Sequence, residues 1–205
     1  MNLSDEDCVE LVKLARNALE NYLEKNVKIT VPNDIASKYN EKAGLFVTLN
    51  SYRRKVEELR GCIGFPMPER ALYDAVVNAA IASATSDPRF HPVTKDELDQ
   101  IAVEISVLTS PELIKVENPK QYKDKIKVGR DGLIIQWRYG SGLLLPQVPV
   151  EHKWDEERFL CETCTKAGAM PDAWLYDDTK VYRFEAIVFK EVEPKGNVVR
   201  VSLNI

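Results

Sequence analysis

The sequence has no long hydrophobic run, and none of its segments approaches the stretch of about 20 apolar residues that a membrane-spanning helix needs. A secretory signal is not indicated either, because residues 1–7 are acidic where such a signal is basic and then apolar. We therefore expect a soluble, cytoplasmic protein that does not act at a membrane.

Basic residues are not in excess, since 28 Lys and Arg face 32 Asp and Glu and the net charge is −4. A protein that neutralises many phosphates carries a basic surplus, so we expect no binding to nucleic acid. The one basic run, Arg53–Lys55, is followed by Glu57 and Glu58, as is typical of a solvated turn. Repeats, heptads and the glycine-rich motifs of nucleotide-binding sites are also absent.

Histidine is scarce and cysteine is sparse. The chain has four cysteines, which we expect to be reduced in the cytosol unless the source is a hyperthermophile, and the many Lys and Glu with few Gln are typical of a thermophilic protein. Cys161 and Cys164 have a C-x-x-C spacing inside a predicted helix, but a zinc site would need two more ligands from elsewhere. Core packing is the alternative, and we expect neither a metal nor a cofactor.

The hydrophobic periodicity predicts an α+β protein. Helical spacing begins after a possible capping box formed by Ser4 and Asp7, whereas other segments alternate as strands do. Because the helices interrupt hairpin-like strand pairs, we expect a mostly antiparallel sheet flanked by helices, with a single core and an appended subdomain. The predicted helices are 5–25, 69–85 and the segment from Asp155 to Gly168, and the predicted strands are 44–49, 58–63, 101–108, 133–138, 143–145, 181–192 and 198–203.

The segment Arg60–Gly64 carries the most specific chemistry. The two glycines beside Cys62 would let a ligand approach the thiol and would let backbone N–H groups point at an anion. A lowered pKa, caused by Arg60 and such a nest, would make the thiol a nucleophile that alkylates faster than the other three. The alternative is a bulged strand end at which Cys62 fills a small space in the core.

A cysteine nucleophile normally needs a base. The chain offers only His91 and His152, both in predicted loops where either could be an exposed spacer. Asp87, Glu104 and Glu151 are alternative bases, but no sequence rule places any of them beside Cys62.

The segment Leu59–Gly64 resembles the signature of the AMMECR family, and six further segments resemble the same family in the same order. The resemblance therefore spans nearly the whole chain. These segments are Asp87–Phe90, Glu104–Leu108, Leu143–Val148, Lys166–Gly168, Pro171–Trp174 and Tyr182–Glu185.

The resemblance implies a single domain over residues 1–205, with a larger subdomain from both chain ends, a smaller one from the middle, and a cleft between them. It implies Cys62, Glu104 and Glu151 as candidate catalytic residues. It implies Arg60, Gly61, Gly64, Asp87, Arg89 and Gln147 as candidate ligand-binding residues. His91 departs from the family pattern, where proline is usual.

Two functions remain open. A binding or adaptor module would hold another protein at the Leu59–Gly64 surface, and the resemblance suggests Memo-like or radical SAM proteins as partners. An enzyme would use Cys62 as nucleophile or redox centre on a small polar or anionic substrate, with Arg60 and Arg89 holding the anion. In both cases we expect Leu59–Gly64 and Asp87–Phe90 to meet in space, as one wall of the cleft.

Overall fold

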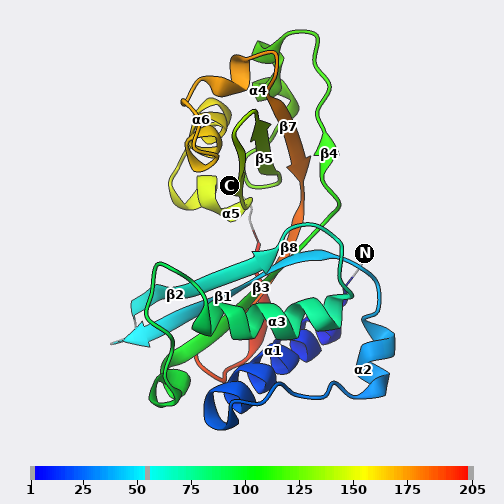
Figure 1. The fold of residues 1–205 in the computed structure, drawn as a ribbon, viewed down its shortest axis with the longest axis vertical. Helices are drawn as coiled ribbons and strands as arrows, with labels where there is room; N and C mark the ends of the chain where they lie inside the picture. The colour runs from blue at the N-terminus through cyan, green and yellow to red at the C-terminus, as the bar shows by residue number, and fades with distance from the viewer. Residues whose placement is uncertain (1–2, 54–55, 203–205) are drawn as a thin grey trace. The chain divides into compact units, whose positions relative to one another are not determined.

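The fold is that of a computed structural model, which describes residues 3–53 and 56–202 (Figure 1). The chain divides into two compact units: unit 1 comprises residues 1–108 and 187–201, and unit 2 comprises residues 109–186 with 202–205. Antiparallel sheets flanked by helices confirm the predicted α+β class. Within the described ranges, no helix combines the length and apolar character that crossing a membrane requires.

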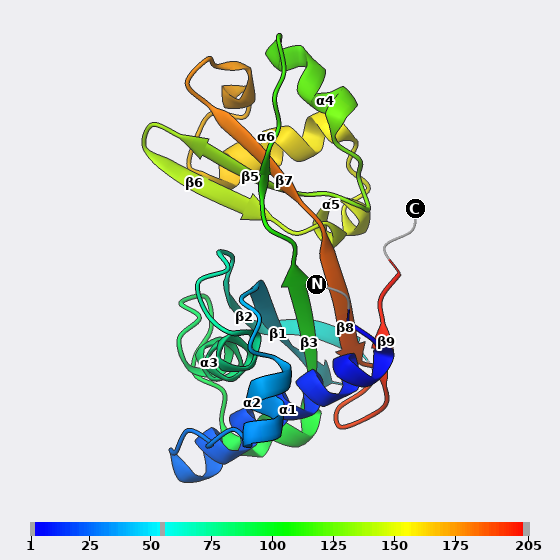
Figure 2. The same ribbon diagram turned by 90° about the vertical axis from the view of Figure 1, so that its right-hand side faces the viewer.

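Unit 1 is a five-stranded sheet with helices α1 and α3 packed on one face (Figures 1 and 2). Its strand order is β2-β1-β3-β8-β9, and β1 pairs antiparallel with both β2 and β3. The elements are α1 (Asp5–Lys25), α2 (Asn33–Lys38), β1 (Gly44–Arg53), β2 (Val56–Phe65), α3 (Leu72–Thr85), a 3-10 helix (Lys95–Gln100), β3 (Ile101–Leu108), β8 (Ala186–Glu191) and β9 (Val198–Arg200). The predicted hairpin of the first two strands is confirmed, although part of its charged turn lies outside the described residues.

Helix α1 begins where the sequence predicts. Ser4 Oγ accepts a hydrogen bond from Asp7 N at 3.2 Å, and Asp7 Oδ2 accepts one from Ser4 N at 2.8 Å, which completes the capping box. Such a cap stabilises a helix by about 1 kcal/mol. The helix ends at Asn26, whose φ of 54° lies in the left-handed region. Cys8 is buried in the first turn of this helix.

Unit 2 is a four-stranded sheet of order β4-β7-β5-β6, against which α6 packs. Its elements are β4 (Glu112–Leu113), a 3-10 helix (Pro119–Gln121), α4 (Tyr122–Lys125), β5 (Gly132–Trp137), β6 (Gly140–Leu144), α5 (Gln147–Glu151), α6 (Glu156–Lys166), a 3-10 helix (Ala173–Leu175) and β7 (Lys180–Phe184).

The glycines of the β5–β6 hairpin do not form its turn, although the predicted strands 133–138 and 143–145 leave them between the two strands. Gly140 and Gly142 lie in β6, and the turn is made by the two residues before them. A Cβ on Gly142 would overlap the backbone of Ala167, just beyond the end of α6. Gly142 therefore lets this strand lie directly against the end of the helix.

The predicted strand 181–192 is two strands. It is interrupted at Glu185, so that β7 belongs to the sheet of unit 2 and β8 to the sheet of unit 1. At the interruption, Thr109 N donates to Glu185 O at 2.9 Å and Glu185 N donates to Thr109 Oγ1 at 2.8 Å. These bonds join the two chain segments that lead from one unit to the other.

A buried ion pair ties α1 to β8. Arg16 Nε donates to Glu191 Oε1 at 2.6 Å, and Arg16 Nη2 donates to Glu191 Oε2 and to Ile101 O. Glu191 Oε2 also accepts from Val103 N at 3.0 Å. The side chains of Arg16 and Glu191 are 10% and 4% exposed. Both carboxylate oxygens are thus hydrogen-bonded in an almost completely buried position.

We expect Arg16→Met to lower the free energy of unfolding by about 3–5 kcal/mol, because it leaves the Glu191 carboxylate buried without its cation. The double variant Arg16→Met/Glu191→Leu removes both charges and should lose much less. Urea unfolding of the two variants beside the parent protein measures the difference. A double variant as unstable as the single variant would show that lost packing, and not the unpaired buried charge of Glu191, causes the loss of stability.

Candidate functional site

The Arg60–Gly64 motif lies in β2, an edge strand of the unit 1 sheet. Its register pairs Leu49 with Gly61 and Thr48 with Cys62. Because successive residues of a strand point to opposite faces, Gly61 faces α3 and Cys62 faces the side of the sheet without helices.

The two glycines allow close packing. A Cβ on Gly61 would overlap the carbonyl oxygen of Ser83 in α3, and a Cβ on Gly64 would overlap the carbonyl oxygen of Leu45 in β1. Gly61 thus allows the last turn of α3 to lie on β2. That a ligand also reaches the thiol at these positions stays a prediction.

The backbone N–H groups of the motif bind groups of the protein itself. Cys62 N donates to Asp87 Oδ2 at 2.8 Å, and Ile63 N donates to Ser83 Oγ at 2.9 Å. The anion that the predicted nest was expected to hold is thus the Asp87 carboxylate. The sequence prediction that Leu59–Gly64 meets Asp87–Phe90 is confirmed by this contact, because α3 returns along β2 and brings the loop after it to the motif.

Asp87 is hydrogen-bonded both to the motif and within its own loop. Its Oδ1 accepts from Arg89 N at 3.1 Å and from Arg89 Nε at 3.0 Å, and its Oδ2 accepts from Arg89 Nη2 at 2.7 Å. The side chain of Asp87 is 3% exposed, whereas that of Arg89 is 50% exposed. The Arg89 guanidinium holds the pKa of the Asp87 carboxyl well below its usual range, and the N–H of Cys62 adds to this effect.

Arg60 does not act on the thiol as the sequence analysis expected. Its Nε donates to Glu97 Oε1 at 2.9 Å and its Nη1 donates to the carbonyl of His91 at 2.8 Å. Its Nη2 donates to Glu97 Oε2 and more weakly to the carbonyl of Pro92. Glu97 also accepts from Thr94 N and completes a capping box. Arg60 therefore fastens the loop after α3 onto the edge strand.

The surroundings of Cys62 do not favour a thiolate. Burial raises the pKa of the Cys62 thiol above its ordinary value, and the negative charges of Glu104 and Asp87 act in the same direction. The hydrogen bond from Thr48 Oγ1 at 3.3 Å and the charge of Arg89 oppose this effect without overcoming it. The predicted lowering of the thiol pKa is thus not produced, because Arg60 is paired elsewhere.

Thr48, which the sequence analysis did not single out, joins two of the predicted residues. It pairs with Cys62 of β2 on one side and with Glu104 of β3 on the other, so the three residues form one row across the sheet. The only available signal was the register of the hairpin, which is set by the hydrophobic pattern of its strands and by its turn. Ser83 and Glu97 were missed because their contacts are made across long stretches of sequence.

The remaining candidates fall into unit 2. Gln147 and Glu151 are the first and last residues of α5. That they share a site with Cys62, in a cleft, stays a prediction. His152 follows them and stacks on Trp154 with ring centroids 4.8 Å apart.

The other thiols do not form a metal site. Burial raises the pKa of Cys164 to about 12, and Cys161 lies on the same helix at intermediate exposure. Among residues 3–53 and 56–202, no group of three or more His, Cys, Asp or Glu side chains is placed to hold a metal ion.

Unit 1 thus presents an edge strand and a loop that are held together by internal hydrogen bonds on an α+β scaffold. The family model described as AMMECR1 matches residues 12–189, and the chain belongs to this family.

Known relatives and a solved structure are similar to nearly the whole chain. A protein of Methanocaldococcus jannaschii is 54% identical over 94% of each chain, and one of Pyrococcus abyssi is 56% identical over 94% of each. The crystal structure of an uncharacterised protein from Pyrococcus horikoshii covers 98% of each chain with 53% identity and a TM-score of 0.93. These relatives are thermophilic archaea, in agreement with the composition.

We expect Asp87→Asn to lower the free energy of unfolding at neutral pH by about 2 kcal/mol, the typical contribution of a hydrogen bond to a charged group. The pKa of Asp87 is depressed in the folded protein, so its contribution is complete above the unfolded value of about 3.9 and is lost as the pH falls through the folded value. Urea unfolding at a series of pH values tests this. The difference in the free energy of unfolding between the parent protein and Asp87→Asn should become smaller below about pH 4. Asp177→Asn removes a carboxylate at an exposed position and is the control.

We also expect Cys62 to alkylate slowly. Its rate should rise with pH around a midpoint above the about 8.5 of an unperturbed thiol, and Arg89→Gln should move that midpoint higher by removing a favourable charge. Iodoacetamide labelling, followed residue by residue through mass spectrometry of peptides, measures both. A midpoint below that of a free thiol would restore the nucleophile hypothesis.

Proposed function

We propose that this protein is a binding module that recognises a partner protein through the loop of residues 87–92, held on β2, with Arg89 as its charged contact. One observation carries the proposal. The polar groups of Arg60, the Asp87 carboxylate and the N–H of Cys62 all serve to fix the loop, whereas Arg89 keeps half of its side chain in solvent.

The loop is prepared for binding because it is fastened at both ends. Asp87 holds its start to Cys62, and Arg60 holds its end through the carbonyls of His91 and Pro92. Two prolines restrict the backbone further. A partner therefore meets a surface that loses little conformational entropy on association.

Arg89 suits this role chemically. Arg89 Nε and Arg89 Nη2 each donate a hydrogen bond to the Asp87 carboxylate. Within the described part of the chain, Arg89 Nη1 makes no hydrogen bond. The guanidinium also lies over the ring of Phe90, 5.4 Å from the centroid, which holds it in place. Arginine is enriched among residues that dominate binding energy, and a bidentate contact to a carboxylate suits its geometry. We infer an acidic group on the partner.

The family resemblance directs the search for this partner to Memo-like and radical SAM proteins. The alternative function, catalysis through Cys62, has less support. Its thiol pKa is raised, and Arg60, the cation expected to activate it, is bonded to Glu97.

The proposal predicts that Arg89→Glu weakens partner binding. Capture from a lysate of the source organism, and titration calorimetry with its Memo-like protein, would compare the parent, Arg89→Glu and Arg138→Glu. Arg138 is a matched control because it is 67% exposed and lies in unit 2. We expect at least about a tenfold loss of affinity for Arg89→Glu, or about 1.4 kcal/mol, and little change for Arg138→Glu.

Binding that is equal in all three proteins would contradict the proposal. A Cys62→Ala variant that keeps partner binding intact would support it further, since the thiol has no part in the contact. If Cys62→Ala removed binding while Arg89→Glu did not, the thiol and not the loop would be the recognition element.

A further inference from the structure

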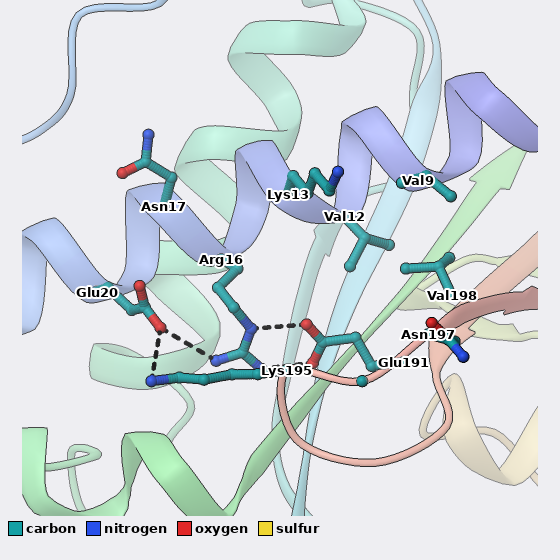
Figure 3. Close-up of a pocket in the computed structure, with 11 residues that line it drawn as sticks. Val9, Val12, Lys13, Arg16, Asn17, Glu20, Glu191, Lys195, Asn197 and Val198 are labelled. Carbon is teal, nitrogen blue, oxygen red and sulfur yellow. Dashed lines mark hydrogen bonds and ion pairs between the residues drawn. The ribbon is translucent and has the colours of Figure 1, made fainter.

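Unit 1 carries a groove that is lined by none of the residues proposed for partner binding. It runs between α1 and the segment that joins β8 to β9, and its volume is about 690 Å³ (Figure 3). The lining residues that come from α1 are spaced three or four apart, so they form one face of that helix. The lining residues are Val9, Val12, Lys13, Arg16, Asn17, Glu20, Glu191, Lys195, Gly196, Asn197 and Val198.

The polar end of the groove contains two charged atoms that lack hydrogen bonds. Arg16 uses Nε and Nη2 on Glu191 and Ile101, but within the described residues its buried Nη1 has no hydrogen-bond partner. Glu20 Oε1 is also buried without one. These two atoms lie 3.5 Å apart, and Glu20 Oε1 lies 3.5 Å from Lys195 Nζ as well (Figure 3).

Glu20 is the weakly held member of this group. Charged hydrogen bonds have lengths of about 2.7–2.9 Å, so contacts of 3.5 Å are attractive but poorly formed. The same two cations have shorter contacts with other acids. Arg16 is hydrogen-bonded to Glu191, and Lys195 Nζ donates to Asp99 Oδ1 at 2.7 Å. The side chain of Glu20 is 31% exposed on the helix surface, which allows it to turn outward. Its carboxylate would then leave Arg16 Nη1 open to the groove.

The other end of the groove is apolar. Val9, Val12 and Val198 lie together beyond the Arg16–Glu191 pair (Figure 3). Val12 is already buried at 1% exposure, but Val9 and Val198 are partly exposed. A ligand with a hydrocarbon body would remove the surface of these two side chains from water, whereas an inorganic anion would leave it uncovered.

We propose that this groove binds a small organic carboxylate with an apolar body, and that Glu20 occupies the position of the ligand's carboxylate when the groove holds no ligand. The ligand carboxylate accepts from Arg16 Nη1 and Lys195 Nζ, and its hydrocarbon chain covers Val9 and Val198. Glu20 then competes with the ligand for the same two cations. This site is independent of the partner surface at Arg89.

Methyl NMR of the whole protein tests the proposal with hexanoate as the probe. Hexanamide has the same shape without the charge, and inorganic phosphate has charge without the hydrocarbon. We expect saturable shifts of the Val9, Val12 and Val198 methyl resonances with hexanoate only. Equal responses to hexanamide would overturn the carboxylate assignment, and saturable shifts with phosphate would overturn the need for an apolar body.

Charge variants that spare the buried pair make the test specific. Glu20→Gln should tighten hexanoate binding by about three- to fivefold, the value of one partly exposed ion pair, because the competing carboxylate is gone. Lys195→Gln should weaken it by a similar factor. Lys166→Gln makes the same change in net charge at an exposed position of unit 2 and should leave the affinity unchanged. No saturable shift in Glu20→Gln, or no tightening relative to the parent protein, would overturn the proposal.

Discussion

The carboxylate of Asp87 is the constraint on which the motif region depends. It is almost completely buried, and it satisfies both the N–H of Cys62 and the guanidinium of Arg89. An edge strand normally offers unpaired backbone groups to other chains, and here a loop side chain binds one of these groups in place of another strand. The same contact fixes where the loop lies, which way Arg89 points and how much negative charge Cys62 experiences.

This constraint supports the binding role that we propose for the motif. A catalytic site needs groups that interact better with the transition state than with the ground state. In the folded protein Arg60 is already hydrogen-bonded to Glu97, the Asp87 carboxylate to Cys62 N and Arg89, and Ile63 N to Ser83. These interactions fix the position of the loop and leave Arg89 half exposed, as the proposed recognition of a partner requires.

The sequence predicted the features that depend on local chemistry. The cap at Ser4, the first hairpin and the irregular loop after α3 each follow from neighbouring residues. It did not predict why Gly61 and Gly142 are glycines, because the groups they approach, Ser83 and Ala167, are distant in sequence. The division of residues 181–192 between two sheets was missed for a similar reason. The alternating pattern continues through the interruption, and only the pairing partners change.

The two arginines of unit 1 that the proposals concern are paired differently. In the loop at the edge of the sheet, Arg89 has one acid partner, and half of its side chain lies in solvent. On the helix side, Arg16 has a complete partner in Glu191, so Glu20 is not needed to neutralise it. A carboxylate that the buried pair does not require can be displaced without leaving a charge uncompensated. For this reason the groove beside α1 can exchange its own carboxylate for one from a ligand while the fold keeps its central ion pair.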